Sequence, residues 1–295
     1  MNRILISGSS GPIGAALVPS LEQAGAEVVR LVRGPARNSQ QISWDPMSEL
    51  SPAVVSGFDA VIHLAGESVV GRWTAAKKNA IRDSRVLGTQ GVATALARAE
   101  SKPKVFVCAS AIGFYGHRGD EILTEESAGG RGFLAEVSRD WEAMSRIAAE
   151  DGIRTVNVRI GLALSEQGGA LAKMLPPFKL GLGGRLGSGQ QWWSWIHVDD
   201  IVGAIQHIIQ TDDVSGPVNL VSANPVRNEE FTKVLAGVLG RPAFFPVPEF
   251  AMRLALGEAA EELMLASQRV EPAKLKASRY VFRYADLNAA LESLV

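Results

Sequence analysis

Three glycines near the start of the 295-residue chain are the residues whose type and spacing have the clearest chemical meaning. Gly8, Gly11 and Gly14 follow an apolar run, residues 4–6, and lead into a stretch with helical character, residues 15–24. A phosphate can approach a backbone closely only where side chains are missing, and a helix N-terminus offers free N–H groups and a partial positive charge. The order of strand, glycine turn and helix therefore predicts a phosphate site; the alternative is a tight turn that binds nothing.

The spacing of these glycines is G-x-x-G-x-x-G, which differs from the G-x-G-x-x-G of the commoner dinucleotide fingerprint. We expect the turn as a whole to bind a dinucleotide cofactor. The cofactor-binding residues predicted in it are Gly8, Ser9, Ser10, Gly11, Pro12, Ile13 and Gly14.

The residue after the second predicted strand indicates which dinucleotide is bound. An acidic residue there accepts a hydrogen bond from the ribose 2′-hydroxyl and favours NAD. Here the strand ends Leu31-Val32-Arg33, and a guanidinium suits a phosphate. The sequence therefore predicts NADP(H), with Arg33 at the 2′-phosphate and Arg37 assisting from the following loop. The alternative interpretation of Arg33 is a solvated loop cation.

Composition and charge argue against several other classes. Hydrophobic residues make up 46% of the chain and charged residues 21%, which is ordinary for a soluble globular protein. The formal net charge of −1 favours neither nucleic acid nor an anionic membrane, and no apolar run reaches the roughly 20 residues of a membrane helix. The one cysteine, Cys108, excludes an internal disulfide and fits a reducing compartment, so we expect a cytoplasmic protein; the four histidines have no metal-site spacing.

The elements that must position the glycine turn alternate along the first 210 residues. Short buried runs predict strands at residues 28–32, 41–44, 59–66, 105–109 and 155–160, and longer runs predict helices at 15–24, 74–99, 133–150 and 199–209. Repeated strand–helix–strand units predict an α/β fold, a doubly wound parallel (Rossmann) sheet with helices on both faces. The last part of the chain is expected to form a smaller, mostly helical C-terminal lobe.

The expected division into domains follows from this change of character. Residues 1–165 form the predicted NADP(H)-binding Rossmann core, and residues 190–225 add to its sheet and cover. The glycine-rich residues 166–189 and residues 226–295 form the predicted substrate-side lobe, which closes a cleft over the sheet edge. Trp192, Trp193 and Trp195 fit a substrate wall or a packed core equally well.

Five motifs give the chain a resemblance to the extended short-chain dehydrogenase/reductase superfamily, which includes nucleotide-sugar epimerases and dehydratases. They are the glycine turn, residues 61–66, residues 110–116, Arg159-Ile160-Gly161 and the W-I-H-V-D-D of residues 195–200. Residues 64–67, 181–184, 195–197 and 269–272 make the chain similar, more narrowly, to an atypical subfamily of NAD-dependent epimerase/dehydratase-like proteins. In that subfamily, called epimerase family proteins, the C-terminal segment has no assigned role.

The resemblance implies further contacts with the cofactor. It places the end of the fourth strand and the segment beside the nicotinamide along the cofactor, and it adds an arginine of the long helix 74–99. The residues so implied are Leu64, Ala65, Gly66, Glu67, Arg85, Ser110, Arg159 and Gly161. For Arg85, a solvated or sheet-packing side chain is the alternative.

The catalytic pair of the superfamily is missing at the matching positions. Members that transfer a hydride use Tyr-x-x-x-Lys, in which the lysine lowers the pKa of the tyrosine and a serine or threonine orients the substrate oxygen. Counted back from Glu142, the tyrosine position is Leu134 and the lysine position is Ser138. The Ser/Thr position is Ala111. None of these three side chains can do the expected proton chemistry.

Tyr115 and Ser110 are the candidates that remain for catalysis. We expect Tyr115 to line the pocket and to act as an acid, or else to pack there or contact the substrate. His197 is expected to be a hydrogen-bonded structural residue rather than a catalytic one. Asp199 and Asp200 open a predicted helix and are interpreted as caps rather than as a metal site.

Two functions remain open from the sequence. The first is an NADP(H)-dependent oxidoreductase or epimerase-like enzyme that acts on a small molecule in the cleft, with a mechanism that departs from that of its relatives. The second is a non-catalytic NADPH-binding protein that senses redox state or binds a partner. Helices 74–99 and 133–150 form a dimer interface in many relatives; here their apolar stripes fit a homodimer or packing on the sheet.

Overall fold

Seven parallel strands form the central sheet of the computed structural model, which describes residues 3–295. Their order across the sheet is β11-β7-β5-β4-β1-β2-β3. The strands are β1 (Arg3–Ser7), β2 (Glu27–Val32), β3 (Gln41–Ser43), β4 (Ala60–His63), β5 (Val105–Ala111), β7 (Arg154–Ile160) and β11 (Gly216–Leu220). The order reverses at β1 and β4, and in such sheets ligands bind beyond the carboxyl ends of the strands at this switch point.

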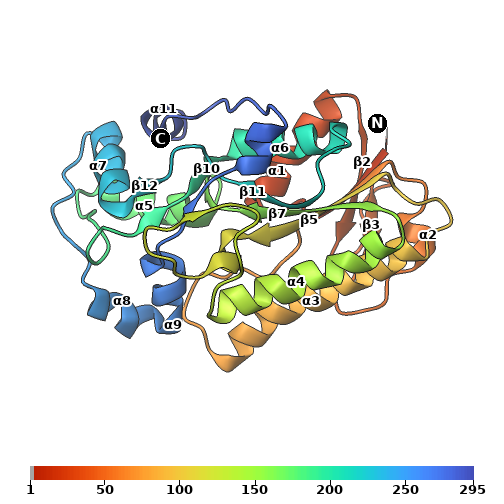
Figure 1. The fold of residues 1–295 in the computed structure, drawn as a ribbon, viewed down its shortest axis with the longest axis horizontal. Helices are drawn as coiled ribbons and strands as arrows, with labels where there is room; N and C mark the ends of the chain where they lie inside the picture. Colours follow the sequence, from red (N-terminus) through yellow and green to blue (C-terminus); the bar gives the residue numbers. More distant parts are fainter. Residues whose placement is uncertain (1–2) are drawn as a thin grey trace.

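Helices cover both faces of the sheet (Figure 1). On one face α3 (Ala75–Ala97) and α4 (Phe133–Glu150) run side by side, and on the other α1 (Pro12–Gln23) lies against α6 (Val198–Gln210). The short α2 (Pro52–Val55) packs beside α3. Thr74 begins α3, because its side chain accepts a hydrogen bond from the N–H of Lys77. The chain therefore has the predicted doubly wound α/β fold.

Successive strand side chains enter two separate apolar cores. In β1, Ile4 and Ile6 pack with residues of α1 and α6, whereas Leu5 packs with residues of α3 and α4. Because both faces are covered, the central strands are apolar almost throughout, and all four residues of β4 are buried. The last of them, His63, is the polar exception, and it lies at the switch point of the sheet.

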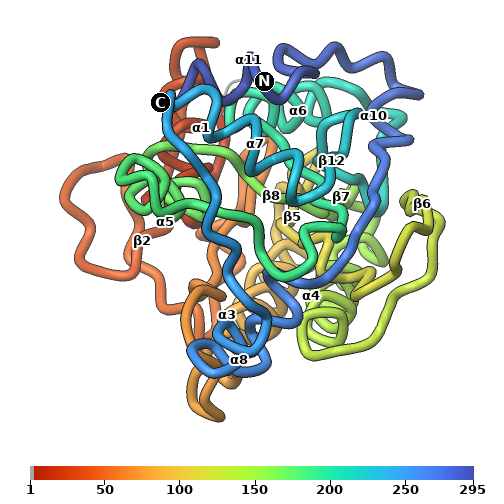
Figure 2. Tube along the Cα trace, turned by 90° about the vertical axis from the view of Figure 1, so that its left-hand side faces the viewer, coloured from red at the N-terminus to blue at the C-terminus, as the bar shows by residue number. Residues whose placement is uncertain are grey.

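The C-terminal part of the chain adds short elements at one end of the sheet. α8 (Glu249–Leu256) and α9 (Glu258–Ala260) contact each other, α7 (Asn228–Leu239) lies apart from them, and all three lie away from β3 (Figure 1). In Figure 2, α8 lies by the start of α3, where Lys78 donates to Glu258 at 2.8 Å. The remaining elements are η1 (Ile112–Tyr115), α5 (Gly169–Lys179), the π-helical turn η2 (Glu261–Leu265), α10 (Ala273–Ala277), α11 (Leu287–Glu292) and the paired strands β6 (Ile122–Leu123) with β13 (Arg269–Val270), β8 (Leu162–Leu164) with β10 (Trp195–His197), and β9 (Trp192–Trp193) with β12 (Val226–Arg227).

The main difference from the sequence prediction is α5. The sequence predicted no helix between the glycine-rich loops at residues 168–169 and 181–189, and Pro176 and Pro177 lie inside the helix found there. Burial of Leu171, Leu175 and Phe178 in the C-terminal core compensates for this poor propensity. The domain boundaries stay a prediction; β11, which pairs with β7 at the edge of the sheet, lies within residues 190–225. Within residues 3–295, no helix is both long enough and apolar enough to cross a membrane.

Candidate functional site

The glycine turn after β1 is packed so tightly that two of its glycines cannot be replaced. A Cβ on Gly8 would lie 2.6 Å from the carbonyl carbon of Leu64, and one on Gly14 would lie 2.3 Å from the carbonyl oxygen of Gly8. Gly8 also has a φ of +73°, which favours glycine. A Cβ on Gly11 would meet only the Gly8 oxygen, at 3.4 Å. Gly8 and Gly14 thus shape the turn, and Gly11 keeps its outer surface open.

The first backbone N–H groups of α1 are available to bind a ligand. Gly11 is the N-cap, Pro12 is the first helical residue, and the first turn contains no acidic side chain. Within residues 3–295, the N–H groups of Ile13 and Gly14 have no hydrogen-bond partner. Unpaired donors at the positive end of a helix dipole suit an anion. The geometry therefore fits the phosphates of a dinucleotide, as the sequence predicted.

Cations gather beside this turn, at the ends of β2 and β4. Arg33 follows β2 and is exposed, and among the described residues its side chain has no hydrogen bond or ion pair. Glu67 binds Lys77 at 2.6 Å. That hydrogen bond, helped by the charges of Lys77, Arg33 and Arg85, outweighs burial and lowers the pKa of Glu67. Arg33 is thus close enough to influence Glu67 while remaining free for a ligand.

Arg85 of α3 is a half-buried cation with an incomplete set of partners. Its Nη1 donates to the backbone oxygens of Glu67 and Ile81, at 2.8 and 3.2 Å. The guanidinium packs on Gly66, where an added Cβ would lie 3.2 Å from its Cζ, and over the ring of Trp141. Burial lowers the pKa of Arg85 to about 10, although the charge of Glu67 opposes this. A half-buried cation beside the switch point is suited to an anionic ligand.

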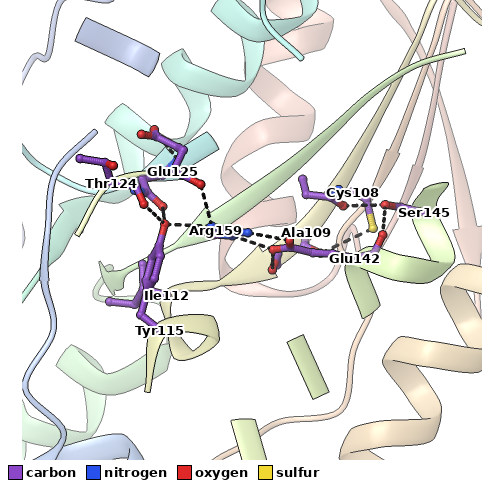
Figure 3. Close-up of polar contacts among 12 residues, drawn as sticks. Cys108, Ala109, Ile112, Tyr115, Thr124, Glu125, Glu142, Ser145 and Arg159 are labelled. Atoms are coloured by element: carbon purple, nitrogen blue, oxygen red, sulfur yellow. Dashed lines mark hydrogen bonds and ion pairs between the residues drawn. The ribbon is translucent and has the colours of Figure 1, made fainter. Parts of the chain in front are cut away.

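Ser110 and Tyr115, the two catalytic candidates, lie instead in a buried polar network, in which Figure 3 labels Tyr115, Arg159 and Glu142. At its centre, Arg159 of β7 binds Glu142 of α4 through two bonds of 2.8 Å, and the two residues are only 4% and 6% exposed. Ser110 donates to the same carboxylate at 2.6 Å. Burial alone would lower the pKa of Arg159, but the hydrogen bonds and charge of Glu142 raise it. This bidentate pair joins α4 to the sheet.

Tyr115 is the other end of this network. Its hydroxyl lies 2.7 Å from Asn219 Oδ1 and 3.0 Å from the Thr124 oxygen, and accepts a hydrogen bond from Arg159. Tyr115 is fully buried, and burial raises the pKa of its hydroxyl despite the nearby Arg159. The expectation that it lines an open pocket is therefore not met. A proton donor must reach its substrate, and this hydroxyl is committed to internal partners.

The other implied residues divide between the two regions. Leu64 and Ala65 continue β4 next to the glycine turn, and Leu64 donates to the Ser7 oxygen. Gly161 follows β7, and its missing side chain is explained by packing, since a Cβ would lie 2.3 Å from the Ser194 oxygen. Arg159 and Ser110, which were predicted to contact the cofactor, both donate hydrogen bonds to Glu142 inside the network. Their roles as cofactor contacts stay predictions.

A cavity of about 500 Å³ lies between η1, the start of α4 and the C-terminal segment. Leu134, which the sequence predicted to stand at the position of the superfamily's tyrosine, lines it, whereas Ser138 is buried. Glu262 of η2 reaches the head of α4, where its oxygens accept from the N–H groups of Phe133 and Leu134 at 2.8 and 2.7 Å. Because α4 has no side-chain cap of its own, this distant carboxylate caps it.

The C-terminal segment is fastened to the Rossmann core by several hydrogen bonds. Ser267 donates its N–H to His117 Nδ1 at 3.1 Å and its hydroxyl to the Gly119 oxygen at 2.7 Å. Gln268 donates to the backbone oxygens of Ile112 and Gly116. The segment therefore forms one wall of the cavity. The sequence predicted a lobe that closes a cleft, but not these individual partners, which are about 150 residues away.

The remaining candidates have structural partners. His197 accepts from the N–H of Asp199 and contacts the Ser293 hydroxyl, and burial lowers its pKa. Asp200 is fully buried and accepts from the N–H groups of residues 283 and 284. Trp195 is fully buried. Burial raises the pKa of the Cys108 thiol to about 12, and the described part of the chain contains no group of side chains suited to a metal ion.

Comparison with known proteins agrees with this geometry. Residues 4–221 match the model of the NAD dependent epimerase/dehydratase family, and residues 247–294 match a domain of unknown function, DUF1731. The chain belongs to the NAD dependent epimerase/dehydratase family. The DUF1731 match covers the segment that walls the cavity.

Several relatives match over nearly the whole chain. An epimerase family protein of Mycobacterium bovis is 40% identical over 98% of this chain and 96% of its own length. The crystal structure of the human epimerase family protein SDR39U1 with NADPH superposes with a TM-score of 0.92, at 33% identity, over 99% of this chain and 98% of that one. A nucleoside-diphosphate sugar epimerase from Corynebacterium glutamicum is 40% identical, and its structure superposes with a TM-score of 0.81. The match covers 98% of this chain but only 57% of that protein.

Proposed function

We propose that this protein is an NADP(H)-binding, epimerase-like oxidoreductase that acts on a small molecule in the cavity between the Rossmann core and the C-terminal segment. The observation that carries the proposal is a tightly packed glycine turn beside a helix N-terminus whose N–H groups have no hydrogen-bond partner in residues 3–295. Gly8 and Gly14 hold the turn, and the N–H groups of Ile13 and Gly14 have no partner in residues 3–295. The human relative with bound NADPH supports the same assignment.

Selection of NADP(H) over NAD(H) is assigned to Arg33. The residue follows β2, its side chain is exposed, and the described residues include no carboxylate paired with it. A guanidinium binds phosphate in a planar, bidentate manner and cannot accept a hydrogen bond from a ribose hydroxyl. Arg85, packed against Gly66, would add positive charge beneath the pyrophosphate. When bound, the nicotinamide would supply hydride chemistry.

A calorimetric titration of NADPH and NADH into the wild type and two variants tests this proposal. Arg33→Ala should weaken NADPH binding about tenfold or more and leave NADH binding unchanged, because only NADPH carries the extra phosphate. Arg98→Ala is the matched control, since this exposed arginine near the end of α3 pairs only with Glu49. Equal affinity of the wild type for the two cofactors would contradict the proposal.

A second function, non-catalytic NADPH binding, is favoured by one observation. Leu134, the predicted counterpart of the superfamily's tyrosine, lines the cavity, and Ser110 and Tyr115 are engaged with internal partners. A protein that binds NADPH but reduces none of a panel of aldehydes, ketones and quinones, and that captures a partner only with NADPH bound, would support this second function. Turnover of any panel member that requires NADPH would instead support the oxidoreductase.

A further inference from the structure

The cavity contains hydrogen-bonding groups that the protein itself leaves unused. We propose that it binds a small monocarboxylate bearing a hydroxyl next to the carboxylate, that is, a hydroxy acid. Arg131 and His117 would hold the carboxylate, and Glu262 would accept the hydrogen bond of the hydroxyl. This deepens the proposed function, and rests on it only for the assumption that the cavity is the substrate site.

Two free donors face the cavity. Arg131 lines it, and within residues 3–295 its guanidinium has no hydrogen bond or ion pair. His117 also lines it, and its Nδ1 accepts the N–H of Ser267 at 3.1 Å. The neutral ring therefore carries its hydrogen on Nε2, which has no protein partner in the described chain. A guanidinium and a ring N–H together match a carboxylate.

These donors and Glu262 belong to adjoining backbone. His117 follows Gly116, where an added Cβ would lie 2.7 Å from the Arg131 oxygen. Arg131 precedes Gly132, where an added Cβ would lie 2.9 Å from Glu262 Oε1. Each Glu262 oxygen accepts one N–H from the head of α4 and retains a lone pair. A cation, a neutral donor and an acceptor thus line the cavity from adjoining segments of the chain.

The other charges of the cavity oppose a ligand with two phosphates. Its second guanidinium, Arg227, binds Asp120 at 3.0 Å and stacks over Trp192. Glu249 and Glu261 also line the wall, and both pair with Arg253. One unpaired cation among these carboxylates suits one carboxylate of a ligand better than a nucleoside diphosphate.

Three matched compounds test the inference by calorimetry: mandelate, its neutral amide mandelamide, and phenylacetate, which lacks the hydroxyl. We expect mandelate to bind at least about tenfold more tightly than either of the others. Arg131→Gln should remove the preference for mandelate over mandelamide. Glu262→Gln should remove the preference for mandelate over phenylacetate. Arg146→Gln, an exposed α4 residue outside the cavity, should keep both preferences.

Several results would overturn the inference. These are tighter binding of UDP-glucose than of mandelate, a preference for mandelate over mandelamide that survives in Arg131→Gln, or no mandelate binding by protein that still binds NADPH. Arg131 is exposed, so its variant is expected to fold even if Glu262→Gln, which weakens a helix cap, does not. Mandelate selectivity without NADPH binding would remove the proposed function and leave this inference standing.

Discussion

The carboxyl edge of the sheet has two halves that differ in how their polar groups are used. Beyond β1 and β4, the N–H groups at the head of α1 and the Arg33 guanidinium are without partners in the described chain. Beyond β5 and β7, Ser110, Tyr115 and Arg159 all have partners within the protein. Unpaired donors cost free energy unless water or a ligand meets them, whereas a satisfied network mainly stabilises the fold. We therefore propose that the first half, the binding half, holds the cofactor, and that the polar network of the second half mainly stabilises the fold.

The largest effect is expected from Glu142→Gln, which leaves the buried Arg159 guanidinium without its counter-charge. Breaking one partner of a buried ion pair typically costs about 3–5 kcal/mol. Urea unfolding should show a loss of this size. The double variant Glu142→Gln/Arg159→Met should recover part of it, because no buried charge is then left unpaired. A loss below about 1 kcal/mol would show that the β5–β7 half is not held by this pair.

A slightly smaller effect is expected at the glycine turn. Gly14→Ala places a Cβ 2.3 Å from the Gly8 oxygen, and we expect about 3 kcal/mol of destabilisation. Gly11→Ala, whose Cβ meets nothing closer than 3.4 Å, should keep the stability of the wild type and weaken NADPH binding. Thermal unfolding and NADPH titration separate the two. An equal loss of stability in both variants would contradict the view that Gly14 is required by packing and that Gly11 leaves room for the cofactor.

His63 gives the binding half a pH-dependent stability. Its Nδ1 lies 2.7 Å from Ser7 Oγ, and its Nε2 is without a partner in residues 3–295. Burial lowers the pKa of His63 from 6.5 to about 4. Below pH 6.5 the unfolded chain therefore binds a proton that the folded chain excludes, so stability present above pH 6.5 is lost as the pH falls towards 4.

Between pH 6.5 and pH 5 this linkage should remove about 2 kcal/mol from the free energy of unfolding. Urea titrations at the two pH values would measure it. In His63→Gln that part of the pH dependence should disappear, whereas His207→Gln, a variant of a partly buried histidine on α6, should retain it. An unchanged slope in His63→Gln would assign the pH dependence to other groups.

The smallest effect is expected at Thr74, which belongs to neither half. Its hydroxyl caps α3 by accepting from the N–H of Lys77 at 3.2 Å. Thr74→Ala should cost about 1 kcal/mol in thermal unfolding and leave NADPH affinity unchanged. Thr74→Ser, which keeps the hydroxyl, should lose much less. A change in NADPH affinity would show that the start of α3 is coupled to the cofactor half.

The sequence was sufficient for the parts of the fold that depend on local pattern. Strand–helix alternation predicted the sheet, and helix 133–150 matches α4 at both ends. Local pattern did not predict α5, because Pro176 and Pro177 disfavour a helix there and the helix is stabilised by burial of its apolar side chains in the tertiary structure. It also failed for partners far apart in the chain. The Tyr115–Asn219 bond spans 104 residues and the Glu262–Phe133 bond 129, so neither of these two contacts could be predicted from local pattern.

Hydrogen–deuterium exchange with and without NADPH would test the contrast between the two halves most directly. The account predicts that NADPH slows exchange most strongly at the backbone amides of residues 8–16, including the unpaired N–H groups of Ile13 and Gly14. The buried amides around Glu142 and Arg159 should already exchange slowly and should change little. Unchanged exchange at residues 8–16 in NADPH-saturated protein would contradict the account.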